Sequence, residues 1–331
     1  MAGPNTMADG AGFTNQKFAV AIVGPTCSGK TAISMELSKL VECEIVSADS
    51  RQVYRLIDIG TAKPTADEMS IVPHHLVDIA PLDELVSAGV YGKLARDTVA
   101  EIFARHKLPL IVGGSGLYIR AIVDGLFDAP EIDMGIREEL RGRLKSEGAG
   151  KLLEELKLVD PDAAKGLVPQ NYKRILRALE VYRTSGKKIS TLRVERTQKP
   201  DFETIQFGIV LERNELYRRI ESRVDEMIAA GLIEEVKELL RRGFDPELNS
   251  LQTVGYKESI GYVQGKLRFE DMVSLIKMNT RRYAKRQLTW FRKDPRIIWL
   301  NADGKSAKSL AREIYENFES APWALKDLTH R

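Results

Sequence analysis

A hydrophobic run that leads through a glycine-rich turn into a helix-forming stretch constrains the fold of this chain more than any other feature. Residues 18–23 are apolar, a turn follows, and residues 32–40 favour a helix. The turn matches G-x-x-x-x-G-K-[ST], whose glycines let backbone N–H groups surround phosphate oxygens at a helix N-terminus. The sequence therefore predicts a phosphate-binding loop made of Gly24, Pro25, Thr26, Cys27, Ser28, Gly29, Lys30 and Thr31.

Further strands and helices indicate where this loop lies in the fold. Residues 44–49 and 108–112 are expected to be strands, and residues 88–106 between them have helical spacing. Strands that alternate with helices indicate a parallel sheet with helices on both faces, and ligands of such sheets bind beyond the carboxyl ends of the strands. We therefore expect an α/β fold, a P-loop NTPase-like sheet, with the loop, Asp49 and the glycine-rich turn at 113–115 close together.

The pattern changes at about residue 128, where two amphipathic helices, 137–158 and 171–184, occur with no strand between them. A strand at 204–211 then returns to the sheet, followed by helices 214–230, 232–242 and 270–292 and a strand at 296–300. The simplest interpretation is a helical insertion domain, 128–203, within a core of 18–127 and 204–331. Residues 1–17 are small and polar, and are expected to form a disordered tail.

Composition favours an intracellular protein without a structural metal. No apolar run reaches the ~18 residues of a membrane span, and Cys27 and Cys43 form no CxxC pair. We expect a cytoplasmic protein with no membrane association, acting as a monomer.

Positive charge is concentrated in two windows of the chain. Residues 170–199 hold nine Lys/Arg against two acids, and residues 273–296 hold eight against one, although the net charge of the whole chain is only +3. Two basic windows on an otherwise acidic chain favour an extended polyanion as partner, and solvated helix faces are the alternative.

The carboxylates near the loop argue for group transfer. An NTP-hydrolysing motor normally has an Asp at the end of an apolar strand, to order Mg²⁺ and water. Here the strand at 108–112 is followed by glycines, and Asp49 is the well-placed acid near the loop. Asp49 is thus available to act on an acceptor, and a small-molecule kinase, which shares this layout, stays open at this point.

Seven ordered motifs resemble one family, the bacterial-type tRNA dimethylallyltransferases. The resemblance runs from about residue 18 to residue 300, with Ser115 where the family usually has Thr and Cys27 where it usually has Ala. The motifs are GPTCSGKT at 24–31, DSRQVY at 49–54, DIGTAKP at 58–64, VGGSGLY at 112–118, RALE at 177–180, VGY at 254–256 and KRQLTW at 285–290.

The resemblance implies a chemistry for the loop. The family moves a dimethylallyl group from its diphosphate to the exocyclic N6 amine of an adenosine beside the anticodon, so the loop would hold a diphosphate and no nucleoside triphosphate would be needed. Asp49 matches the family's general base, and Arg223 matches an arginine credited with diphosphate binding. By position, Thr26 would stabilise the leaving diphosphate and Thr31 would ligate Mg²⁺.

The same resemblance implies residues that contact tRNA. They are Asp49, Ser50, Arg51, Gln52, Ser115, Arg137, Lys173, Arg174, Ile175, Leu176, Arg177, Gln252, Thr253, Val254, Gly255, Tyr256 and Lys257. The target adenine would have to leave its stack to reach Asp49.

Three other functions stay open on the sequence. They are prenyl transfer to free adenine nucleotides, a P-loop small-molecule kinase and a noncatalytic nucleic-acid-binding module. The basic windows and the long insertion disfavour the first two, because a mononucleotide needs neither. The phosphate loop together with Asp49 disfavours the third.

Overall fold

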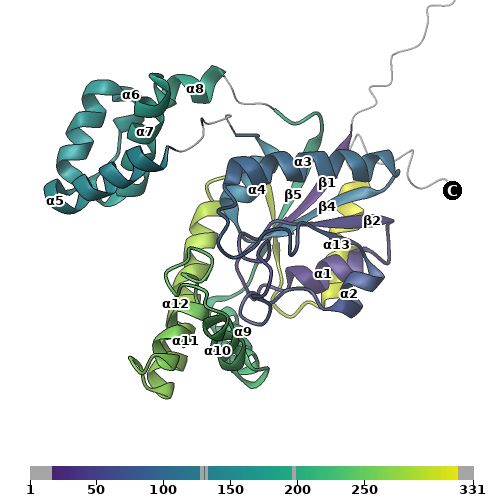
Figure 1. The fold of residues 1–331 in the computed structure, drawn as a ribbon. Coiled ribbons are helices and arrows are strands. Elements are labelled where there is room, and N and C mark those ends of the chain that lie inside the picture. Colours follow the sequence, from purple (N-terminus) through teal and green to yellow (C-terminus); the bar gives the residue numbers. More distant parts are fainter. Residues whose placement is uncertain (1–16, 127–129, 131–132, 196–198, 320–331) are drawn as a thin grey trace, which may run out of the picture.

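A sheet of parallel strands forms the centre of the molecule (Figure 1). The computed structural model describes residues 17–126, 130, 133–195 and 199–319, so the expected tail at 1–16 lies outside the described residues. In the described part of the chain the six strands follow the order β3-β2-β4-β1-β5-β6. They are β1 (Phe18–Val23), β2 (Cys43–Ser47), β3 (His74–His75), β4 (Leu108–Gly113), β5 (Glu203–Val210) and β6 (Ile297–Asn301).

Helices cover both faces of this sheet. Alternate residues of β1 belong to two different cores, Ala19 and Ala21 to one and Val20 and Ile22 to the other, because successive side chains of a strand point to opposite faces. The first core includes α3 (Ala88–Ala104), α4 (Gly116–Val123), α10 (Leu232–Arg241), α11 (Tyr256–Val263) and part of α12 (Phe269–Phe291). The second includes α1 (Lys30–Leu37), α9 (Arg213–Ala229) and α13 (Ala307–Glu319). The short α2 (Ala66–Ile71) leads into the edge strand β3.

A separate group of helices stands away from the sheet in Figure 1. It comprises α5 (Met134–Val159), α6 (Pro161–Ala164), α7 (Tyr172–Ser185) and α8 (Ile189–Glu195), joined in part by a 3₁₀ turn (Pro169–Asn171). These helices bury their own apolar cluster, which shares no buried member with the two cores at the sheet. The group lies within the predicted insertion, whose limits at 128 and 203 stay a prediction.

The expected strands at 44–49, 108–112, 204–211 and 296–300 are confirmed within a few residues. The helix expected at 137–158 is bent, because Gly148 adopts φ 81° and ψ 161° inside α5. The sequence patterns did not predict β3, α2, α6, α8, α11 or α13. None of the described helices is long and apolar enough to cross a membrane.

Candidate functional site

The phosphate loop connects β1 to α1 and depends on two glycines with positive φ. Gly24 has φ 150°, and a Cβ atom there would lie 2.8 Å from the carbonyl oxygen of Ile209. Gly29 has φ 91° and forms the N-cap of α1. Since side chains are strained at such angles, this loop geometry requires glycine at both positions.

Two polar side chains of the loop, Lys30 and Ser28, have no side-chain hydrogen-bond partner among the described residues. Lys30 donates from Nζ to the carbonyl oxygen of Pro25 at 2.7 Å, and no described carboxylate forms an ion pair with it. Burial lowers the pKa of Lys30 to about 8, although the charge of Asp49 acts to raise that pKa. Ser28 is 1% exposed, and no described residue bonds its Oγ. The Lys30 ammonium has no described carboxylate partner, and the buried Ser28 hydroxyl has no described hydrogen-bond partner. Both groups could therefore bind the oxygen atoms of an anionic ligand.

Asp49 lies just beyond the carboxyl end of β2, at the edge of the sheet that also carries the loop. Its Oδ1 accepts a hydrogen bond from the backbone N–H of Arg51 at 2.8 Å. Its negative charge acts to raise the pKa of Lys30 in the loop. The N–H of Ser50 donates to Ser115 Oγ at 2.9 Å, which joins the end of β2 to the end of β4. The expected convergence of loop, Asp49 and glycine-rich turn is therefore confirmed.

Two arginines of α9 border the loop. A Cβ atom at Gly29 would lie 3.8 Å from Nη1 of Arg219. Burial raises the pKa of Cys27, whereas the positive charges of Lys30 and Arg223 act to lower it. Arg223 is 45% exposed, and its nearest carboxylate oxygen, on Glu226, is 4.0 Å away. Arg219 is paired with Glu215 at 2.7 Å, which offsets part of its charge, so Arg223 supplies more of the positive potential at the loop.

Two residues of α12 complete the site, and sequence reasoning missed both. Gln287 accepts from the N–H of Thr26 at 2.8 Å and donates to the carbonyl oxygen of Gly114 at 2.9 Å. Burial and the charge of Asp49 raise the pKa of Tyr283 to about 12, while a hydrogen bond with Ser115 acts to lower it. The KRQLTW motif contains Gln287, but more than 250 residues separate it from the loop, so no local pattern indicates the contact.

The structure corrects part of the expected tRNA contacts. Ile175 and Leu176 are 0% and 8% exposed inside the helical group, and Tyr256 is 0% exposed beneath Gly60. Because these side chains are buried, assigning them to tRNA contact is wrong. By contrast, Lys173, Arg174 and Lys257 are exposed.

Other residues of that set make bonds within the protein. Arg137 is 16% exposed and forms a two-pronged ion pair with Glu180 at 2.8 and 3.1 Å, and Arg177 lies 3.4 Å from the same carboxylate. Gln52 accepts from Ser47 and donates to the carbonyl oxygen of Ala62.

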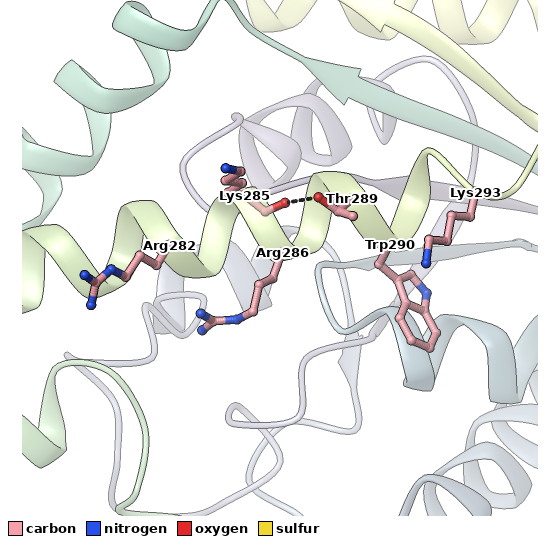
Figure 2. A pocket seen from close by; sticks show the side chains of 6 residues that line it. All are labelled: Arg282, Lys285, Arg286, Thr289, Trp290 and Lys293. Carbon is pink, nitrogen blue, oxygen red and sulfur yellow. Dashed lines mark hydrogen bonds between the residues drawn. The ribbon is translucent and has the colours of Figure 1, made fainter. Parts of the chain in front are cut away.

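Beside this site, α12 presents a hollow of about 400 Å³ with a cationic lining. Figure 2 shows Arg286 and Trp290 on the same side of the helix, and Lys285 on the opposite side. The ring of Trp290 covers Gly116, where a Cβ atom would lie 2.2 Å from Cδ1. The lining comprises Arg282, Lys285, Arg286, Thr289, Trp290 and Lys293.

Known proteins share both the sequence and the fold. A family model described as IPP transferase matches residues 52–294. A tRNA dimethylallyltransferase 1 from Syntrophotalea carbinolica is 46% identical over 88% of this chain and 93% of that protein. The crystal structure of a tRNA isopentenylpyrophosphate transferase from Bacillus halodurans has 41% identity and a TM-score of 0.67, covering 92% of this chain and 95% of that one. A eukaryotic dimethylallyltransferase described as acting on tRNA has 28% identity and a TM-score of 0.74, over 91% and 80% of the two chains.

Proposed function

The chain belongs to the IPP transferase family, and we propose that it transfers a dimethylallyl group from dimethylallyl diphosphate to N6 of an adenosine next to the anticodon of tRNA. In this reaction the C–O bond to the diphosphate breaks, a C–N bond forms, and the amine loses a proton. The observation that supports the proposal is that the phosphate loop, whose buried Ser28 hydroxyl has no partner among the described residues, and Asp49 lie beyond the carboxyl ends of strands of one parallel sheet.

The loop side of the site stabilises the leaving group. As the C–O bond breaks, negative charge develops on the diphosphate, and fixed donors aimed at it lower the barrier. Lys30 and the loop amides supply these donors, with Thr26 and Ser28 contributing hydroxyl groups. Arg219 and Arg223 add positive charge from α9.

Mg²⁺ fits the loop together with the diphosphate. The described residues contain no group of three or more His, Cys, Asp or Glu side chains that could hold a metal by themselves. Mg²⁺ commonly takes few protein ligands and several phosphate oxygens, so one hydroxyl at the loop suffices. Thr31 is exposed at the start of α1 and would be that ligand. The bound ion would neutralise charge on the departing diphosphate.

Asp49 acts as the general base. An adenine amine is a weak nucleophile because its lone pair is delocalised into the ring. A carboxylate that accepts the amine proton while the C–N bond forms contributes roughly 10²–10⁴-fold to the rate. Asp49 is partly buried at the end of the sheet. An adenine that is stacked in the anticodon loop could not reach it there, so the target base would be flipped out of its stack.

The basic surfaces hold the tRNA backbone. Lys173 and Arg174 on α7 and the cations of α12 that line the hollow are spaced for phosphate contacts, which position a nucleic acid without reading its sequence. A monomer carries all of these groups, and we propose that the protein acts as one, in the cytoplasm.

One assay separates this function from its alternatives. The protein would be incubated with dimethylallyl diphosphate and Mg²⁺ plus an unmodified anticodon stem-loop, AMP, or neither. We expect prenylated adenosine only with the stem-loop. Prenylation of AMP alone would identify a free-nucleotide enzyme. A phosphorylated product that requires ATP would identify a kinase, and binding without any product would identify a noncatalytic module.

A further inference from the structure

A single buried side chain of α12 bridges two strand ends that lie far apart in the sequence. Gln287 is 6% exposed, and both ends of its amide are bonded to backbone, one to the Thr26 N–H in the phosphate loop and the other to the Gly114 carbonyl after β4. The amide lies so close that a Cβ atom at Gly114 would be 2.2 Å from Nε2. The glycine at position 114 is therefore explained by the approach of α12.

This bridge connects the two chemical sides of the site. Thr26 belongs to the loop that holds the leaving group. Gly114 precedes Ser115, whose Oγ accepts from the N–H of Ser50, the residue next to Asp49. The position of the Gln287 amide thus fixes the distance between the diphosphate and the base.

The same helix carries the cationic hollow of Figure 2. Arg286 precedes Gln287 directly, and Trp290, one turn later, packs on Gly116. A displacement of α12 by a polyanion at this face would shift the Gln287 amide and, through its hydrogen bond, the N–H of Thr26 in the phosphate loop.

We propose that Gln287 is a positioning residue that ties the phosphate loop to α12, so that tRNA binding on the cationic face and diphosphate binding in the loop are energetically coupled. The inference rests on the proposed function. It assigns to Gln287 no contact with either substrate. Coupling of this kind is reciprocal, and typical values change an affinity by about 5–150-fold.

The test uses Gln287→Met, which keeps the length of the side chain and removes both hydrogen bonds. The affinity of inorganic pyrophosphate with Mg²⁺ is measured by calorimetry, with and without a saturating unmodified anticodon stem-loop. The ratio of the two affinities is expected to be at least about 5-fold larger in the wild type than in the variant. Because the ratio is compared between two proteins of equal charge, repulsion between the two anions cancels.

A matched control and a kinetic readout separate positioning from general damage. Thr280→Ala removes a hydroxyl on α12 that bonds the carbonyl oxygen of Ile276 in its own helix, and this variant should keep the wild-type ratio. In Gln287→Met, turnover should fall about 10–100-fold while stem-loop affinity stays within about threefold, because misplaced reacting groups slow the chemistry and the cations are retained. If Gln287→Met does not fold, the neutral Gln287→Asn serves instead, because its shorter side chain cannot reach both the Thr26 N–H and the Gly114 carbonyl oxygen.

The outcomes are distinct. An equal ratio in wild type and variant, or a variant with full turnover, would overturn the role of Gln287 even if the stem-loop is prenylated normally. Failure of the wild type to bind or prenylate the stem-loop would instead overturn the proposed function.

Discussion

Charged side chains occur at both ends of the central sheet, but they form ion pairs at the amino end and have backbone partners at the carboxyl end. At the amino end, Glu44 is buried with 4% of its side chain exposed, and it accepts hydrogen bonds from Arg105 and Lys107 at 2.7 to 3.1 Å and lies 2.7 Å from His75 Nε2. At the carboxyl end, Lys30 donates to a backbone carbonyl oxygen and Asp49 accepts from a backbone N–H.

The difference is visible in the pKa values. Burial would raise the pKa of Glu44, but hydrogen bonds from Arg105, His75 and Lys107 lower it to about 2. Burial lowers the pKa of Lys30 to about 8, and no comparable set of partners offsets it. Paired charges stabilise the fold, whereas charges left without partners are available to substrates, so perturbed and unpaired groups mark the functional end.

The largest effect is expected from Lys30→Ala at the carboxyl end. Loss of the loop cation should lower kcat/KM for dimethylallyl diphosphate by about 10²-fold or more, because a fixed charge on the leaving group is removed. Steady-state kinetics with a stem-loop acceptor would measure it. Lys39→Ala is the matched control, since Lys39 is 62% exposed, paired with Glu36 and close by in sequence, just beyond α1. Equal losses in both variants would remove Lys30 from the site.

A pH titration sharpens the same point. The pKa of Lys30 lies near 8 in the free protein, so its charge is present below pH 8 and is lost above it. Diphosphate favours the charged form, and its affinity should therefore fall, approaching about tenfold per pH unit above 8. Calorimetry would measure the pyrophosphate affinity of wild type and Lys30→Arg as a function of pH. The affinity of the variant should fall less above pH 8, because arginine stays charged. The ionisation of pyrophosphate itself affects both proteins equally. Identical pH dependences would contradict the prediction.

A smaller effect is expected on tRNA binding from the helical group. Lys173 and Arg174 are exposed, and no ion pair is found for them among the described residues, whereas Arg177 is already paired with Glu180. Neutralising the first two to Gln should lower the magnitude of the negative slope of log K against log[salt] by about one to two units. The control is Arg241→Gln with Arg242→Gln, two adjacent cations of the α10 C-terminus that pair with Glu238. Superimposable salt titrations of wild type and the α7 variant would mean that α7 does not bind tRNA.

The smallest effect on activity is expected from Glu44→Gln at the amino end. Turnover should stay within about twofold, while the free energy of unfolding falls by about 1–3 kcal/mol, because the cations lose a charged acceptor. The folded-state pKa of Glu44 is below its ordinary value, so this stabilisation is present above pH 4.5 and is lost as the pH falls towards 2. Denaturant titrations at pH 7 and pH 3 would measure the difference between wild type and variant, which should shrink at the lower pH. A Glu44→Gln variant with poor turnover but unchanged stability would contradict the claim that the amino end stabilises the fold and the carboxyl end binds the substrates.

Sequence reasoning predicts the carboxyl end well because its signals are local. The glycines of the phosphate loop and Asp49 after β2 are readable within a few residues of each strand, and topology then places them together. Gln287 and Tyr283 are not readable in this way, because their contacts depend on how α12 packs across the end of the sheet. The same limitation led to the wrong assignment of Tyr256, whose burial against Gly60 and Glu235 is set by tertiary packing.

The central claim is that Asp49 acts on the reacting amine, and single-turnover kinetics with Asp49→Asn tests it most directly. Wild type and variant would each be saturated with dimethylallyl diphosphate, Mg²⁺ and stem-loop, and prenylated adenosine would be quantified over time after rapid quenching. The rate of the chemical step should fall by at least about 10²-fold in the variant. Stem-loop and pyrophosphate affinities should stay within a few-fold, because the carboxylate acts mainly in the transition state. A variant that forms product at the wild-type rate would contradict the account.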